Sequence, residues 1–122
     1  RSLAYESVLH YVSGLPLTFE NGNLDHSLEY GRRFSDANDP RGAAVMKVIH
    51  DDEVDHVGFG LEWLRRLKDP RESDWQAYVS HLSWPQRPAH ARGVIFDVEG
   101  RLAAGMTEDF IDQLRMAQDE PG

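Results

Sequence analysis

The fold of this chain is decided by residues 41–67, which read RGAAVMKVIHDDEVDHVGFGLEWLRRL. This stretch contains no proline, and apolar residues recur along it at helical spacing, namely Val45, Ile49, Phe59, Leu61 and Leu64. The pattern predicts one long helix that organises the rest of the chain.

In the middle of this predicted helix lies the motif Asp52-Glu53-Val54-Asp55-His56. Glu53 and His56 are three residues apart, and Asp52 and His56 four, so these side chains leave the same face of the helix. An ionised carboxylate on an otherwise apolar stripe is costly to bury unless it is paired or bound to a metal. Glu-x-x-His pairs in helical bundles hold the metals of di-iron and di-manganese proteins. On a polar helix face the same spacing is an ordinary salt-bridged pair, so the motif alone leaves both interpretations open.

Two earlier segments, residues 2–13 and 17–36, also carry helical patterns. Gly14 and Pro16 separate them, and a proline there either begins a second helix or kinks a continuous one. The apolar set of the second segment is Phe19, Leu24, Leu28 and Phe34.

The sequence DANDP follows these segments and is typical of a turn, with Asn38 or Asp39 as the cap of the long helix. A turn so short makes the flanking helices antiparallel. Measured from Asn38, Glu20 lies 18 residues before the turn and Glu53 lies 15 after it. At about 1.5 Å per residue, the two carboxylates lie within one helical turn of each other along the hairpin. The heights of His56 and Glu20 match more closely still. Glu20 is therefore a third candidate ligand.

Residues 69–118 differ from the rest and form a C-terminal extension with an irregular, proline-rich middle. A short helix is expected over residues 73–82, with Ser73 as its N-cap. Residues 93–99 are expected to be extended. Thr107 caps a last helix of sequence EDFIDQLRMAQ, and residues 119–122 are expected to be disordered.

The composition fits one domain spanning residues 1–122, with core helices in residues 1–68. The net charge of −8 argues against a nucleic-acid partner. The absence of cysteine excludes disulfides and thiolate metal sites, so any metal must be held by carboxylate, imidazole or water. No apolar run reaches membrane-spanning length and no signal peptide is visible, so a cytoplasmic protein without a membrane partner is expected. The start at Arg1 without Met suggests a processed chain or a fragment.

The block DDEVDHVGFGLEWLRRL resembles the last core helix of a ferritin-like family catalogued as a domain of unknown function, whose pattern runs DE-x-x-HV-x-x-G-x-x-WLR. The segment LTFENGNLDHSLEYGRRF is similar to that family's third core helix, in which a Phe-Glu pair precedes an Asn-Leu-Asp stretch. The segment ARGVIFDVEGRLAAGM is similar to its tail. The resemblance covers about residues 15–110 and implies an all-α, ferritin-like helical bundle of the di-iron carboxylate superfamily.

Carried over residue by residue, the resemblance implies that Glu20 is the single carboxylate ligand and that Glu53 and His56 are the Glu-x-x-His ligands. Asp52 takes the place of the outer partner that orients the ligating imidazole. The implied cofactor is a pair of iron ions, with manganese as the other candidate. The implied chemistry is an oxidation that uses oxygen or peroxide on an unidentified small-molecule substrate.

This sequence departs from the family pattern because it carries only one of the two ligand half-sets of a four-helix core. Two explanations are open. The chain is the C-terminal half of a longer protein, completed by an N-terminal partner half, or two copies pair around a two-fold axis and double the ligands. Either explanation predicts that the chain is not a functional monomer.

Two other functions compete with a metal centre. In the first, the chain is a non-catalytic helical scaffold in which Glu53, His56 and Asp52 form a polar network with Arg32 or Arg33. In the second, it is a mononuclear zinc hydrolase, but the HExxH signature of that class lacks its first histidine here.

Overall fold

The computed structural model describes residues 3–117, and within them every regular element is helical. In chain order the elements are α1 (Leu3–Gly14), η1 (Leu15–Glu20), α2 (Asn21–Asp36), α3 (Pro40–Leu67), α4 (Asp74–His81), η2 (Pro88–Ala91), α5 (Val98–Ala103) and α6 (Glu108–Met116). The all-α fold expected from the sequence is confirmed. The predicted disorder at residues 119–122 lies outside the described residues. None of the described helices combines the length and the apolar character needed to cross a bilayer.

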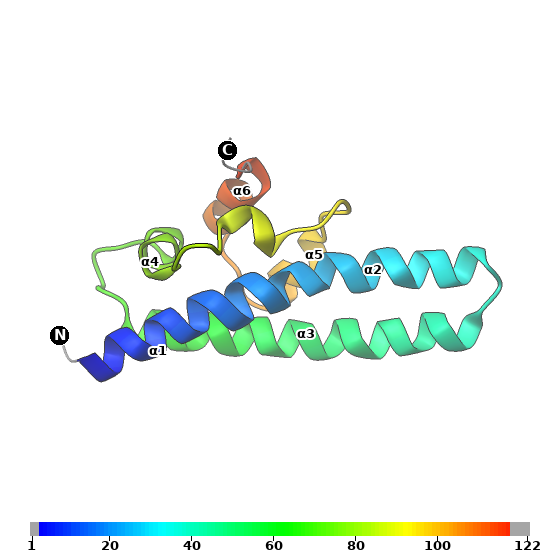
Figure 1. The fold of residues 1–122 in the computed structure, drawn as a ribbon, viewed down its shortest axis with the longest axis horizontal. Helices are drawn as coiled ribbons and strands as arrows, with labels where there is room; N and C mark the ends of the chain where they lie inside the picture. Colours follow the sequence, from blue (N-terminus) through cyan, green and yellow to red (C-terminus); the bar gives the residue numbers. More distant parts are fainter. Residues whose placement is uncertain (1–2, 118–122) are drawn as a thin grey trace.

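Two long antiparallel helical rods form a hairpin (Figure 1). The first rod is continuous from Leu3 to Asp36, because α1, η1 and α2 follow one another without a break. Pro16 lies inside this rod, and the wider π-helical turn of η1 accommodates its ring and its missing N–H. There the N–H of Asn21 donates to the carbonyl of Pro16, five residues earlier. Of the two possibilities for Pro16, the continuous helix is correct.

The turn between the rods is built by local side-chain chemistry. Asn38 has a φ of 59°, in the left-handed region that asparagine tolerates better than most residues. The Asp39 carboxylate then accepts a hydrogen bond from the N–H of Gly42 at 2.9 Å and caps α3. The long helix runs from Pro40 to Leu67, so its predicted bounds are confirmed.

The helices of the extension also begin at the predicted caps. Ser73 accepts from the N–H of Gln76, whose side chain accepts from the N–H of Ser73, which is a complete capping box at the start of α4. Thr107 accepts from the N–H of Phe110 and begins α6. Residues 93–99 were expected to be extended throughout, and this is wrong at the end of the segment. Its last two residues are the first turn of α5, because a side-chain cap at the preceding aspartate begins the helix there.

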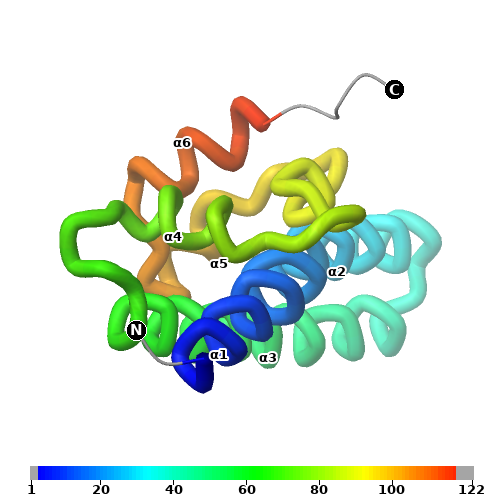
Figure 2. Tube along the Cα trace, turned by 60° about the vertical axis from the view of Figure 1, so that its left-hand side comes forward, coloured from blue at the N-terminus to red at the C-terminus, as the bar shows by residue number. Residues whose placement is uncertain are grey.

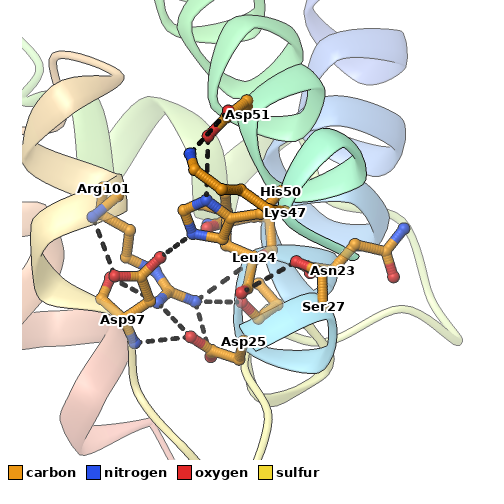
Figure 3. Close-up of polar contacts among 12 residues, drawn as sticks. Asn23, Leu24, Asp25, Ser27, Lys47, His50, Asp51, Asp97 and Arg101 are labelled. Atoms are coloured by element: carbon orange, nitrogen blue, oxygen red, sulfur yellow. Dashed lines mark hydrogen bonds and ion pairs between the residues drawn. The ribbon is translucent and has the colours of Figure 1, made fainter. Parts of the chain in front are cut away.

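The extension is fixed to the hairpin by a buried ion pair (Figure 3). Arg101 in α5 and Asp25 in α2 are both fully buried, and two guanidinium nitrogens of Arg101 donate to the two carboxylate oxygens of Asp25 at 2.7 and 2.9 Å. The same carboxylate accepts from the backbone N–H of Gly93 at 2.8 Å and of Asp97 at 2.6 Å. One side chain of α2 therefore fixes two loop positions and one helix of the extension.

The core lies between the hairpin and the extension, which covers one long side of it in both views (Figures 1 and 2). Its largest apolar members are fully buried: Leu9, Leu17, Leu24, Val57, Leu61, Leu64, Tyr78, Phe110 and Leu114. Tyr78 and Phe110 pack with ring centroids 5.1 Å apart, and the Tyr78 hydroxyl hydrogen bonds Thr18 at 2.7 Å. The hairpin and the extension therefore build this core together, with six of these residues from the hairpin and three from the extension.

Other apolar residues of the hairpin remain exposed. Leu61 and Leu64 are buried as the helical pattern of α3 suggested, but Val45 and Phe59 of the same set are 54% and 52% exposed. Phe19, assigned to the apolar set of the second segment, is 61% exposed. The apolar residues of the hairpin thus lie on two faces, and the extension covers one of them.

Candidate metal centre

Glu20, Glu53 and His56 meet between the two rods of the hairpin. Nδ1 of His56 lies 2.6 Å from Oε2 of Glu20 and 2.7 Å from Oε1 of Glu53. One potential ligand atom from each residue lies within 4.8 Å of those of the other two. The structure therefore brings together the three side chains selected from the sequence, at the heights that the hairpin register predicted.

The local helix geometry explains this meeting. Glu53 and His56 lie one turn apart in α3, and their side chains hydrogen bond each other. Glu20 is the last residue of η1. A π-helical turn contains an extra residue and changes which side chains of the following helix face a neighbour, and such turns recur at functional sites. Here the turn lies directly before α2 and ends on the carboxylate that reaches His56.

The cluster is buried at Glu53 and open at His56. The side chains of Glu53, Glu20 and His56 are 8%, 19% and 53% exposed. Burial, followed by the neighbouring Glu53 carboxylate, raises the pKa of Glu20 above its ordinary value, and His56 opposes this effect. The hydrogen bond with Glu53 raises the pKa of His56. Both shifts favour binding of a proton within the cluster, and that proton would reduce the repulsion between the two carboxylates.

Asn23 completes the surroundings of Glu53, and the sequence interpretation missed this role. Its Nδ2 amide donates to Oε2 of Glu53 at 2.8 Å, while Oε1 of Glu53 faces His56. The signal was present in the sequence, since Asn23 follows Glu20 by one helical turn. The amide therefore holds one carboxylate oxygen and leaves the other directed at the cluster.

Asp52, expected to orient His56, is exposed on α3, whereas Nδ1 of His56 faces the two glutamates. Its proposed role stays a prediction. The scaffold interpretation named Arg32 or Arg33 as a partner of the polar network. Arg33 instead pairs with Glu29 at the surface, at 2.9 Å. The residue that contacts Glu53 from α2 is an asparagine instead of an arginine.

His50 and His81 lie away from the cluster, in polar contacts of their own. His50 pairs with Asp97 at the edge of the Asp25–Arg101 network, so it helps to hold the extension (Figure 3). His81 is buried, donates from Nδ1 to the Ala77 carbonyl at 2.7 Å, and its Nε2 lies 2.8 Å from the carboxylate of Glu6. These contacts tie α4 to its neighbours and are separate from the three-residue cluster.

A hollow of about 250 Å³ opens beside the cluster and is lined by Tyr11, Pro16, Glu20, His56 and Phe59. Its walls are mostly apolar, and two of the three candidate ligands reach it. The donor set of two carboxylates and one imidazole is the chemistry that iron, manganese and zinc accept in proteins. The residues present therefore fit a divalent transition metal.

The fold and the cluster define an all-α protein with a carboxylate–imidazole group on a helical hairpin. The model of the family described as Protein of unknown function (DUF455) matches residues 3–112, so the chain belongs to that family. Comparison with curated proteins and with solved structures gives no match. Because the family description carries no function, the function must be argued from the site.

Proposed function

We propose that this chain is a ferritin-like, metal-binding protein in which Glu20, Glu53 and His56 hold iron or manganese. The observation that carries the proposal is the convergence of two carboxylate oxygens and one imidazole nitrogen within 4.8 Å. The Glu-x-x-His pair on one helix and the single glutamate on its antiparallel neighbour form one half of the ligand set of a di-metal carboxylate bundle.

The electrostatics of the cluster support a cation at this place. Glu53 is 6% exposed, and burying a carboxylate is costly unless a positive charge or several donors balance it. Protonated His56 supplies that charge at low pH, and a divalent ion would supply more of it at neutral pH. The amide of Asn23 would keep the orientation of Glu53 the same in both cases.

Bound iron or manganese would supply redox chemistry with oxygen or peroxide. The chain's own residues would have simpler tasks. Glu20 and Glu53 would neutralise the cation, Asn23 would fix Glu53, and the apolar walls formed by Tyr11 and Phe59 would limit the access of water. A small molecule or oxygen would reach the centre through the hollow that these walls line.

The competing function is a non-catalytic helical scaffold. It is favoured by one observation, which is that Glu20, Glu53 and His56 satisfy one another through hydrogen bonds without a metal. Under that function, replacing Glu53 changes stability and removes no metal-dependent property.

Titration of the metal-free chain with Mn²⁺ by calorimetry separates the two functions. We expect binding in the wild type and at least about a hundredfold weaker binding for Glu53→Gln, which loses a ligand charge at unchanged shape. Glu62→Gln is the matched control, because Glu62 lies on the same helix and pairs with Arg66 at the surface. Absence of Mn²⁺ binding in the wild type, or equal binding in both variants, would favour the scaffold.

The redox part of the proposal has its own test. The chain is loaded with Fe²⁺ without oxygen, then mixed with oxygenated buffer while oxygen uptake is recorded. Uptake above that of free Fe²⁺, lost in Glu53→Gln and kept in Glu62→Gln, is the expected result. Oxygen uptake equal to that of free Fe²⁺ would mean that the chain does not promote the reaction of its metal with oxygen.

A further inference from the structure

We propose that Asp97 is a positioning residue of the metal centre, an inference that rests on the proposed function. Asp97 belongs to the extension and is 7% exposed. It bridges the two rods of the hairpin close to the candidate ligands. The bridge holds Glu20 of the first rod in place relative to Glu53 and His56 of the second.

Asp97 contacts both rods at once (Figure 3). Its backbone N–H donates to the carboxylate of Asp25 in α2 at 2.6 Å. Its own carboxylate accepts a hydrogen bond from Nε2 of His50 in α3. The two rods are therefore joined through a single residue that belongs to neither of them.

The other polar groups of Asp97 fix its position in the extension. Its Oδ1 accepts from the N–H of Gly100 at 2.9 Å and caps α5. Its carbonyl accepts from Nη1 of Arg101 at 3.0 Å, and that fully buried guanidinium is in turn paired with Asp25. A residue held at so many points transmits a fixed spacing from one rod to the other.

Gly100 provides the space that the bridge needs. A Cβ atom at this position would overlap the carboxylate of Asp97 and lie 3.1 Å from Nε2 of His50. Inside a helix, glycine is less favourable than alanine, so helix propensity does not account for it. The close approach of His50 to Asp97 does.

The bridge lies within one helical turn of the centre along each rod. Asp25 follows Asn23 by two residues, about 3 Å along α2, and Asn23 donates to Glu53. His50 precedes Glu53 by three residues, about 4.5 Å along α3. A displacement of either rod at the bridge would therefore move the candidate ligands relative to one another.

Between the bridge and the turn, the two rods leave a hollow of about 500 Å³. Leu28 and Gly31 line it from α2, and Met46 and His50 line it from α3. A metal centre needs its ligands held to within about 0.5 Å. At the end of this hollow nearest the centre, the bridge supplies a direct connection between the rods.

Calorimetric titration of the metal-free chain with Mn²⁺ tests the proposal. His50→Ala removes the α3 end of the bridge and keeps Asp97 as the cap of α5. We expect its affinity for Mn²⁺ to fall by about tenfold, the lower end of the loss caused by removing an outer partner of a metal site. His50→Gln should recover the wild-type affinity to within about twofold, because its side-chain amide can donate to Asp97 in place of Nε2.

Arg65→Ala is the matched control. Arg65 also joins α3 to the extension, through a pair with Asp74 at 2.7 Å, but it lies nine residues beyond His56. This variant should lower the melting temperature and leave the affinity for Mn²⁺ unchanged. Electron paramagnetic resonance at saturating Mn²⁺ adds a readout that lost stability does not move. The zero-field splitting of the bound ion should change in His50→Ala and stay at the wild-type value in Arg65→Ala.

The outcomes separate this inference from the function on which it rests. Equal Mn²⁺ affinity and equal spectra in the wild type and His50→Ala would overturn the role of Asp97 and leave the metal site standing. Equal weakening in Arg65→Ala, or no recovery in His50→Gln, would also overturn it, because the contact with Asp97 would not be the cause. A wild type that does not bind Mn²⁺ would overturn the proposed function as well. If His50→Ala loses its helical circular dichroism, Gly100→Ala, which crowds the same contact, replaces it.

Discussion

Asn23 offers a sharp test of the site, because it contacts a candidate ligand and is not one itself. Its Nδ2 donates to Oε2 of Glu53 at 2.8 Å. In Asn23→Ala this donor is lost, and the buried carboxylate is free to rotate away from His56. Loss of a partner that orients a metal ligand costs about 10- to 100-fold in metal affinity. We expect that loss for Mn²⁺, which equals about 1.4–2.8 kcal/mol of binding free energy.

The assay is calorimetric titration with Mn²⁺ at fixed pH, with Ser27→Ala as the matched control. Ser27 lies one turn further along α2 and donates only to backbone carbonyls of its own helix, at 2.7 and 3.3 Å. Removal of the Ser27 hydroxyl should change the affinity for Mn²⁺ by less than about twofold relative to the wild type. This is below the change caused by losing a partner that orients a metal ligand. If Asn23→Ala binds Mn²⁺ as tightly as Ser27→Ala, the amide does not position Glu53 and the reasoning about this contact is refuted.

Two further predictions concern stability. Asp25→Ala leaves the fully buried guanidinium of Arg101 without its carboxylate, which should lower the free energy of unfolding by about 3–5 kcal/mol. The melting temperature Tm should fall by about 10–20 °C. A Tm within about 3 °C of the wild type would contradict the anchoring role of Asp25. The hydrogen bond with Glu53 raises the pKa of His56 in the folded chain. In the metal-free chain, protonation of His56 therefore contributes stability that is fully present below its unfolded pKa and is lost as pH rises through its folded pKa. Since a cation replaces that proton, the gain in Tm from Mn²⁺ should be larger at about pH 8 than at about pH 6, and equal gains in differential scanning fluorimetry would count against the site.

The parts of the structure that local chemistry determines were predictable from the sequence. Asp39, Ser73 and Thr107 each cap a helix at the expected place, because a cap depends on a few neighbouring residues. The meeting of Glu20 with His56 and Glu53 was also predictable, since a short turn fixes the register of two helices.

Contacts between distant segments were not predictable in the same way. Asp25 and Arg101 are 76 residues apart, and nothing near either position in the sequence marks a buried ion pair. The spacing of Asn23 from Glu20 indicated the correct face of α2, but the hydrogen bond to Glu53 also depends on the relative rotation of the two rods, which the π-helical turn alters.

The apolar pattern indicated which residues are helical but not which of them are buried. Phe19 and Phe59 follow the helical repeat as Leu61 does, yet only Leu61 is covered by the extension. Periodicity reports a face of a helix and does not identify the element that packs on it. The two exposed phenylalanines lie on the side of the hairpin that the extension leaves open.

The most direct test of the central claim is the metal content of the purified chain. The chain is expressed with added iron and manganese, dialysed, and analysed by elemental mass spectrometry beside Glu53→Gln. We predict about one ion per wild-type chain, the share of one hairpin in a di-metal set, and a several-fold lower content in Glu53→Gln. Fewer than about 0.1 ions per wild-type chain would contradict the account, because a site of this donor set should retain its metal through dialysis.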